Sequence, residues 1–123
     1  MAAPNIVNVA TITAKSLGAA LGASSAVILA NSASSGKVFK INNIVVTNVD
    51  GTAAADVTIE YNTAASGSGT SYKIASTISV PADASLIVTD KTTSFYLEED
   101  KSIKGFASAT GDLEIFISYE ELS

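Results

Sequence analysis

Histidine, cysteine and arginine are absent from the 123-residue sequence, and the first two absences exclude whole classes of chemistry. Without histidine the chain lacks the commonest general base and metal ligand, which excludes Ser-His-Asp catalysis, imidazole zinc sites and a histidine pH switch. Without cysteine it can form no disulfide, thiolate nucleophile or zinc-thiolate site, and its redox compartment cannot be read from disulfide usage.

The shortage of positive charge argues against a nucleic-acid partner. Seven lysines stand against twelve acidic residues, which gives a formal net charge of -5. Binding to a phosphate backbone depends on clustered positive charge that releases counterions. We therefore expect no contact with DNA or RNA.

Long apolar runs and targeting signals are also missing. The N-terminal stretch lacks a basic segment followed by an apolar core, as a secretory signal would have. No apolar run reaches the roughly 18 residues that a spanning helix requires. We therefore expect no membrane partner. The chain is nevertheless 47% hydrophobic and only 15% charged, which predicts a single packed domain.

The pattern of apolar residues predicts an all-β chain. Short runs rich in β-branched residues alternate with clusters of Ser, Gly, Asn and Asp, which is typical of strands separated by turns. We predict a strand over Asn5–Lys15 and a loop or bent connection over Ser16–Ser25. Further strands are expected at Ala26–Ala30, within Lys37–Tyr61, at Tyr72–Val80, Ser85–Thr89, Ser94–Glu98, Ser102–Ser108 and Leu113–Glu120.

The segment Lys37–Tyr61 is predicted to be a β-hairpin at the centre of the fold, with its turn at Asn48-Val49-Asp50-Gly51. The apolar alternation in its first strand changes phase at Asn42-Asn43, which predicts a β-bulge that keeps the apolar residues on both sides inward. In the second strand one face is predicted to be core and the other to be solvent-exposed.

Eight or nine short strands with little or no helix indicate one antiparallel β-sandwich or jelly-roll-like domain. We expect residues 1–25 to supply an N-terminal strand and a small-residue connection, with the strand available for pairing with another subunit. Residues 26–123 are expected to form the sandwich core.

Candidate chemical sites are weak. Gly36-Lys37 resembles a phosphate-binding loop only superficially, because Asn31 replaces the first glycine and Val38 follows the lysine. Oxygens of Asn48, Asp50 and Asp56, or of the acidic run Glu98-Glu99-Asp100, could face a calcium ion, but neither group has the spacing of a calcium loop. We therefore expect local turns there, no resident metal or cofactor, and no enzyme activity.

Outward-facing aromatic residues point to an interface. If Leu113, Ile115 and Ile117 face the core, Phe116 must lie on the opposite face, and Phe106 is outward by the same parity. Exposed aromatic residues on a sheet are typical of subunit contacts, although another segment of the chain could cover them instead. Together with the apolar residues of the N-terminal strand, they form our set of interface candidates: Ile6, Val7, Val9, Ile12, Phe106 and Phe116.

The order of strand and turn motifs resembles small virion proteins of tailed bacteriophages, particularly phages of marine bacteria. In those proteins a strand ending in Asn leads to a Gly-containing turn, then a Pro-Ala-x-x-Ser-Leu bend, a Leu-Glu-x-x-Asp-x-Ile corner and a Glu-rich last strand. The matching segments here are 46–51, 81–86, 97–103 and 113–121, with Lys101 as a mild departure in the corner.

The resemblance implies a non-enzymatic structural protein made in the bacterial host cytoplasm and carried on the virion. A capsid decoration protein on the outer head surface is favoured, with the major capsid protein or another virion protein as partner. Self-association is expected, with a trimer first because it suits positions of local symmetry on a shell. Two alternatives are a neck, tail or fibre accessory protein and a carbohydrate-binding adhesin that uses exposed Tyr72, Tyr96 or Phe116.

Overall fold

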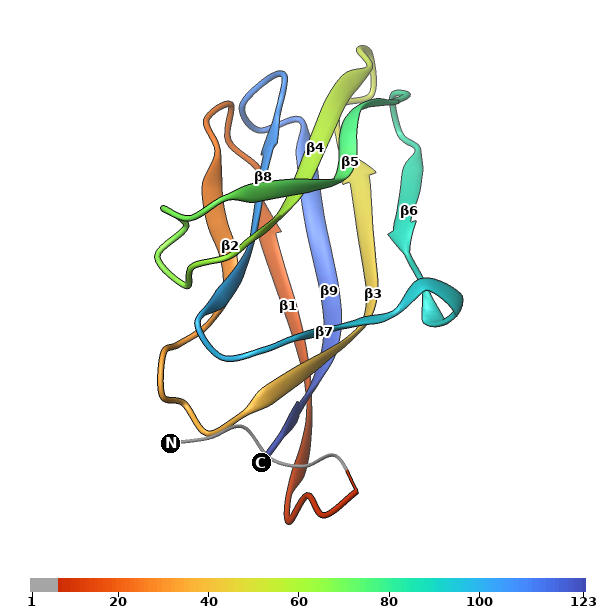
Figure 1. Ribbon diagram of the computed structural model, residues 1–123. Coiled ribbons are helices and arrows are strands. Elements are labelled where there is room, and N and C mark those ends of the chain that lie inside the picture. The colour runs from red at the N-terminus through yellow and green to blue at the C-terminus, as the bar shows by residue number, and fades with distance from the viewer. Residues whose placement is uncertain (1–6) are drawn as a thin grey trace.

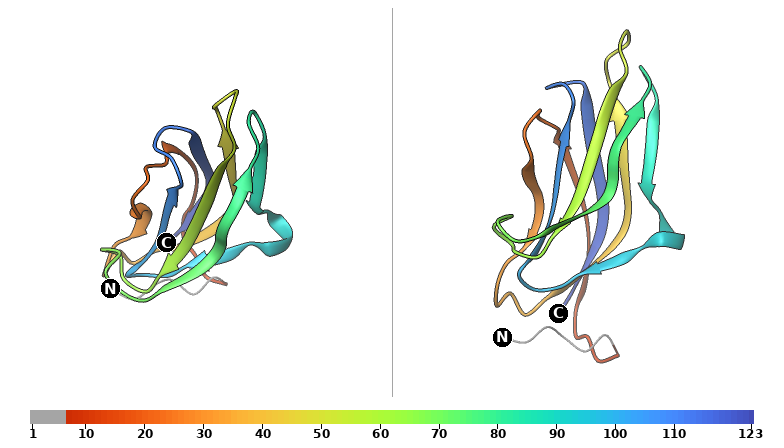
Figure 2. Two further views of the ribbon diagram at one scale, coloured as in Figure 1. Left: turned by 90° about the horizontal axis from the view of Figure 1, so that it is seen from above. Right: turned by 45° about the horizontal axis from the view of Figure 1, so that its top comes forward.

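The computed structural model describes residues 7–123 and contains two antiparallel sheets packed face to face (Figure 1). The two layers are separated most clearly in the view from above (Figure 2). The strands are β1 (Ile12–Ala20), β2 (Ala26–Asn31), β3 (Val38–Asn48), β4 (Ala55–Asn62), β5 (Ser71–Val80), β6 (Ser85–Thr89), β7 (Phe95–Leu97), β8 (Lys101–Ala107) and β9 (Leu113–Leu122).

The sheets differ in size. Sheet A has five strands in the order β1-β9-β3-β6, with β7 also paired to β3, and sheet B has four in the order β2-β8-β4-β5. Within the described part of the chain the one helical element is the short 3-10 helix η1 (Lys91–Thr93). The predicted all-β antiparallel sandwich is confirmed.

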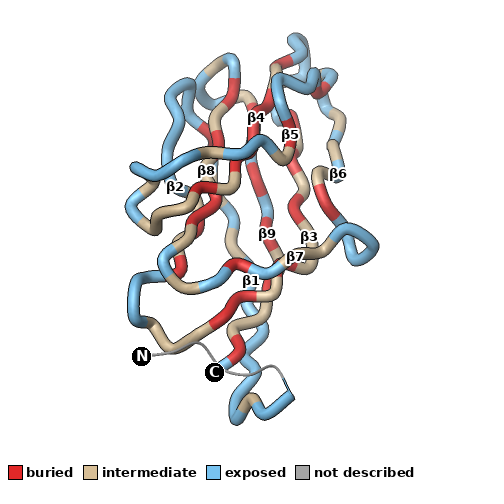
Figure 3. Tube along the Cα trace, in the orientation of Figure 1, coloured by how far each residue is buried: buried red, intermediate tan, exposed pale blue. Residues whose placement is uncertain are grey.

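The core lies between the central strands of the two sheets, as the buried segments of β3, β9, β4 and β8 show (Figure 3). Apolar residues at every second position face the opposite sheet, which is the period-two pattern that the sequence displays. Sheet A contributes Ile41, Ile44, Val46, Leu113, Ile115 and Ile117, while sheet B contributes Val57, Ile59 and Ile103.

The predicted bulge in β3 is confirmed. Ile41 lies beside Tyr119 of β9 and Asn43 lies beside Ser118, so Asn42 is the extra residue. Ile41 and Ile44 are both fully buried, which an uninterrupted alternation would not allow. The bulge also marks where the other edge of β3 changes its partner from β7 to β6.

The predicted hairpin between β3 and β4 is wrong, because the two strands lie in different sheets. Both edges of β3 are already paired, one with β9 and the other with β7 and β6, so β4 has no edge to join. The segment after Asn48 therefore crosses from sheet A to sheet B. Its local turn is present, since the Asp50 carboxylate accepts a bond from the Thr52 amide, although Gly51 does not adopt a positive φ.

The N-terminal boundaries also need correction. The first strand runs over Ile12–Ala20 rather than Asn5–Lys15, and the first half of the predicted loop over Ser16–Ser25 is part of it. Residues 5 and 6 of the predicted strand lie outside the described residues. Pairing with β9 along the whole of β1 outweighs the weak strand preference of Gly18 and the neighbouring alanines. Leu21 then turns into the core, where it is 1% exposed.

The outer face of β4 is not the solvent-exposed face that alternation predicted. Thr58 and Glu60 point away from the core, yet they are 4% and 5% exposed. The hydroxyl of Thr58 accepts a bond from the amide of Thr77, and the carboxylate of Glu60 is held by Lys73 of β5 and Ser25. The kinked strand β5 and the loop before β2 therefore cover part of this face.

Three buried asparagines end strands and tie distant backbone segments together. Asn31 ends β2 and donates to the carbonyl oxygens of Lys37 and Leu97. Asn48 ends β3, and Asn62 ends β4 with bonds that close the loop before β5. Because a buried amide is costly unless it is fully bonded, these residues fix the strand ends in one arrangement.

Candidate interaction surface

The edge of β1 is the most exposed strand edge of sheet A. One side of β1 pairs with β9 from Ile12 to Ala20, and the sheet order ends at β1, so its other side has no strand partner within residues 7–123. None of its residues is buried, as Figure 3 shows. The beginning of β1 and the end of β9 also project beyond the rest of the sandwich (Figure 1). An open edge of this length is a template for pairing with another chain.

The predicted N-terminal interface residues lie at this projecting end. Ile12 begins β1 and is 60% exposed, Val7 is 83% exposed, and Val9 is half-buried. Ile6 lies outside the described residues. Beside this end the Glu121 carboxylate binds the ammonium groups of Lys15 and Lys37, at 3.1 and 3.0 Å. Burial raises the pKa of Glu121, but the two lysines outweigh it and leave that pKa below its ordinary value.

A second exposed surface is the outer face of sheet A, which carries Phe116. Its ring stands on β9, 47% exposed, between Gly18 of β1 and Val45 of β3. Ile87 of β6 lies beside Val45 and is 63% exposed, so the four residues form an apolar row across four strands. Sequence reasoning found Phe116 by its parity but missed Ile87, because the uniformly apolar run Leu86-Ile87-Val88 has no alternation to show which residue points outward.

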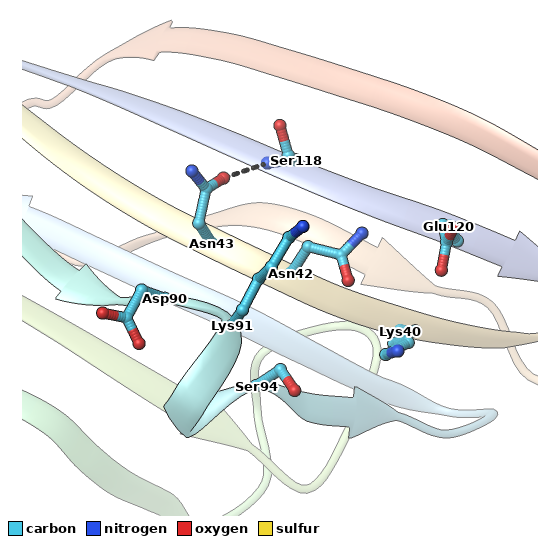
Figure 4. A pocket seen from close by; sticks show the side chains of 8 residues that line it. All are labelled: Lys40, Asn42, Asn43, Asp90, Lys91, Ser94, Ser118 and Glu120. Carbon is cyan, nitrogen blue, oxygen red and sulfur yellow. Dashed lines mark hydrogen bonds between the residues drawn. The ribbon is translucent and has the colours of Figure 1, made fainter.

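The same face contains a polar hollow of about 710 Å³ at the β3 bulge (Figure 4). It is lined by Lys40, Asn42, Asn43, Asp90, Lys91, Ser94, Ser118 and Glu120. Asn43 accepts a bond from the Ser118 amide, and Asp90 caps η1, which lowers the pKa of Asp90 through its bonds to Thr92. Two ammonium groups and two carboxylates balance each other, so the hollow does not favour a ligand of one charge.

Phe106, the other predicted aromatic, lies on the opposite side of the molecule. It points outward from sheet B beside Thr58 and is half-buried. Next to it the nearly buried Glu60 is bound by Lys73, which is the main cause of its lowered pKa. Tyr72 is also on sheet B, whereas Tyr96 lies on the outer face of sheet A beside Lys40. The exposed aromatic residues therefore form no single cluster of the kind that a sugar site uses.

The weak calcium candidates Asn48, Asp50 and Asp56 are not brought together as a cage. The side chain of Asn48 is fully used in bonds to Ala53, Val80 and the Asp50 amide. Asp50 binds Thr52 and so has a lowered pKa, and Asp56 sits on β4. Within residues 7–123 no three acidic side chains converge on a position suited to a metal ion.

The acidic run Glu98-Glu99-Asp100 forms a corner. Glu99 accepts from the Gly36 amide and Asp100 accepts from the Ala65 amide, so two of its three carboxylates hold neighbouring turns. Gly36 and Lys37 follow a turn over Ser32–Ser35 just before β3, and Lys37 is bound to Glu121. Among the described residues, no helix has the length and apolar character that a membrane crossing would need.

Comparison with known proteins gives a match in structure alone. No protein-family model and no curated protein matches the sequence. The fold is similar to a solved subunit of Bacillus endospore appendages, described as a family of disulfide-linked pili, with a TM-score of 0.55 and 18% identity. The match covers 92% of this chain and 87% of the appendage chain, so the two share an overall fold. The absence of cysteine here means that a disulfide linkage cannot be shared.

Proposed function

We propose that this chain is a non-enzymatic structural subunit of a tailed-bacteriophage particle, namely a decoration protein on the outside of the head. The observation that carries the structural role is the open edge of β1, which projects from the sandwich beside the exposed Ile12. An exposed edge of this kind supplies backbone donors and acceptors to a neighbouring subunit. The virion assignment comes from the strand and turn motifs described above.

The fold comparison supports a structural role independently of the phage resemblance. The similar appendage chain builds pili, so the same sandwich serves elsewhere as a repeating unit. In this chain the contacts would have to be non-covalent, since no cysteine is present. Strand pairing and apolar surface are the contacts that remain, and three copies around a local threefold axis of a shell are the arrangement we propose first.

Labelling of intact particles tests the virion role. Antibodies to this chain are applied to purified particles of the phage that encodes it and are located by electron microscopy. Label distributed over the head supports decoration. Label at the tail or neck alone replaces the proposal with an accessory role there, and particles without any label contradict a virion role altogether.

Amide hydrogen exchange tests the edge contact. In the assembled protein, half of the β1 amides should change from fast to slow exchange, because they point away from β9 and would bind the neighbouring chain. The amides of η1 are the internal control, since they lie far from the edge in the fold. Equal exchange of β1 in dissociated and assembled protein would contradict pairing at this edge.

A further inference from the structure

The outer face of sheet A is self-complementary across its width. Two transverse rows of outward side chains can be followed from the strand register. In both rows the β1 and β9 side carries small or acidic residues. The side of β3, β7 and β6 carries large or basic residues. Phe116 and Val45, at the centre of their row, are both apolar and are the exception. The rows are Ala14, Glu120, Lys40 and Tyr96, and then Gly18, Phe116, Val45 and Ile87.

We propose that this face is a two-fold interface with a second copy of the chain. A two-fold axis parallel to the strands, between β9 and β3, places each residue opposite the residue at the reversed position in the same row. Lys40 of each copy then faces Glu120 of the other, and Ile87 faces Gly18. In this arrangement the strands of the facing sheets stay nearly aligned, which is a common packing of two sheets about 10 Å apart.

The charges on this face fit such a contact. Lys40 and Glu120 are half-buried neighbours on adjacent strands, yet within residues 7–123 neither side chain has an ion pair or hydrogen bond. By contrast, the carboxylates of Glu60 and Glu121 are bound by lysines of their own chain. In the proposed dimer two Lys40–Glu120 pairs form across the interface and are shielded from water, where a charge pair contributes more than on the surface.

The shapes also fit. In the row of Phe116, the β1 end is recessed, because a hollow of about 470 Å³ lies beside Phe116 and its lining includes Gly18 and Ala20. At the opposite end of this row, the side chain of Ile87 is 63% exposed and protrudes from the face as a ridge. The axis places the ridge of one copy over the hollow of the other. It also sets Phe116 against Val45, which gives the contact an apolar centre of the kind that interfaces use.

This contact does not rest on the virion role and leaves the backbone edge of β1 open. Pairing at that edge and packing of the face therefore use different parts of the molecule, and both can occur in one assembly. The main alternative to a second copy is that a different protein occupies this face. Mixing two variants of the chain distinguishes a second copy from a different protein.

Charge reversal in two separate proteins is the test. Lys40→Glu alone makes every cross-interface pair acidic, and Glu120→Lys alone makes every pair basic. An equal mixture of the two variants restores two opposite-charge pairs in a mixed dimer. We expect each variant alone to lose the two-chain species in sedimentation and the mixture to recover it. The control Glu98→Lys changes the net charge as Glu120→Lys does, but Glu98 lies in the corner between β7 and β8, outside both rows, so this variant should stay associated.

Thermal melting shows whether each charge variant folds. If one of them does not fold, a cross-linking measurement that leaves both charges unchanged tests the same contact. Because the chain has no cysteine, Ile87→Cys and Gly18→Cys proteins can be mixed and treated with a short bis-maleimide. There is room for the new side chain, since a Cβ at Gly18 would meet Phe116 at 3.9 Å. Cross-linking between the two variants, and its absence when Phe106→Cys replaces Gly18→Cys, is expected. No recovery in the charge mixture, or equal cross-linking to both sheets, would overturn the proposal.

Discussion

Asn48 at the end of β3 donates its side-chain amide to the carbonyl oxygen of Val80 at the end of β5, across 2.9 Å, and so joins sheet A to sheet B. A second bond of the same amide reaches Ala53, and its oxygen accepts from the Asp50 amide. Asn48 is 1% exposed and Val80 is fully buried, so neither partner of the bond between the sheets can turn to water instead. One side chain therefore supplies three bonds to the connection that crosses between the sheets.

Replacing this asparagine should destabilise the fold strongly. Asn48→Ala leaves the carbonyl oxygens of Val80 and Ala53 without this donor, and we expect a loss of about 3 kcal/mol in the free energy of unfolding. Chemical denaturation measures it. The control is Asn42→Ala, because Asn42 is half-buried at the bulge and its side chain makes no hydrogen bond within residues 7–123. Equal losses of unfolding free energy in both variants would show that the hydrogen bonds of the Asn48 side chain do not account for the destabilisation.

Glu60 should make the stability depend on pH in the acidic range. Its bond to Lys73 holds the folded-state pKa below its ordinary value of 4.5. A lowered pKa means that the contribution is fully present above pH 4.5 and is lost as the pH falls through the folded-state pKa. Glu60→Gln should flatten this acidic part of the stability profile. An unchanged slope in that range would assign the pH dependence to other carboxylates.

Asp50 should be nearly dispensable. Its carboxylate binds Thr52 within an exposed turn, so Asp50→Asn keeps an acceptor there and should change the melting temperature little. Calcium added to either protein should leave its melting curve unchanged. A calcium-dependent stabilisation of the native chain that Asp50→Asn abolishes would replace the turn with an ion site.

Two isoleucines of sheet A should respond in opposite ways to the same change. Ile44 is fully buried, so Ile44→Asp places an unpaired charge in the core and should abolish folding. Ile87 is 63% exposed on the outer face, so Ile87→Asp should fold normally and lose only the face contact. Circular dichroism reports the folding of both variants. If Ile87→Asp also unfolds, the residue is part of the core and cannot be an interface ridge.

The positions of the strands after β1 and the core could be predicted from local alternation, whereas the pairing of strands could not. Ile41 and Ile44 revealed the bulge because a phase slip is visible along one strand. The separation of β3 from β4 depends on which strands occupy the edges of β3, and β9, which comes last in the chain, takes one of them. The position of β1 was missed for the same reason, since Gly18 has a weak strand preference of its own.

The candidate surface was predicted in part. Parity along β9 was enough to place Phe116 outside, because buried residues alternate with more exposed ones from Leu113 to Glu120. The row that it shares with Gly18, Val45 and Ile87 exists only once four strands are in register. Lys40 and Glu120 likewise become neighbours through pairing between strands that are far apart in sequence.

The central claim is that this chain works by associating with copies of itself. Sedimentation equilibrium of the native protein over a range of concentrations measures this directly, because the mass depends on association and not on any assumed partner. We predict a species heavier than one chain that becomes more populated as the concentration rises. The mass of a single chain at every concentration would contradict the account.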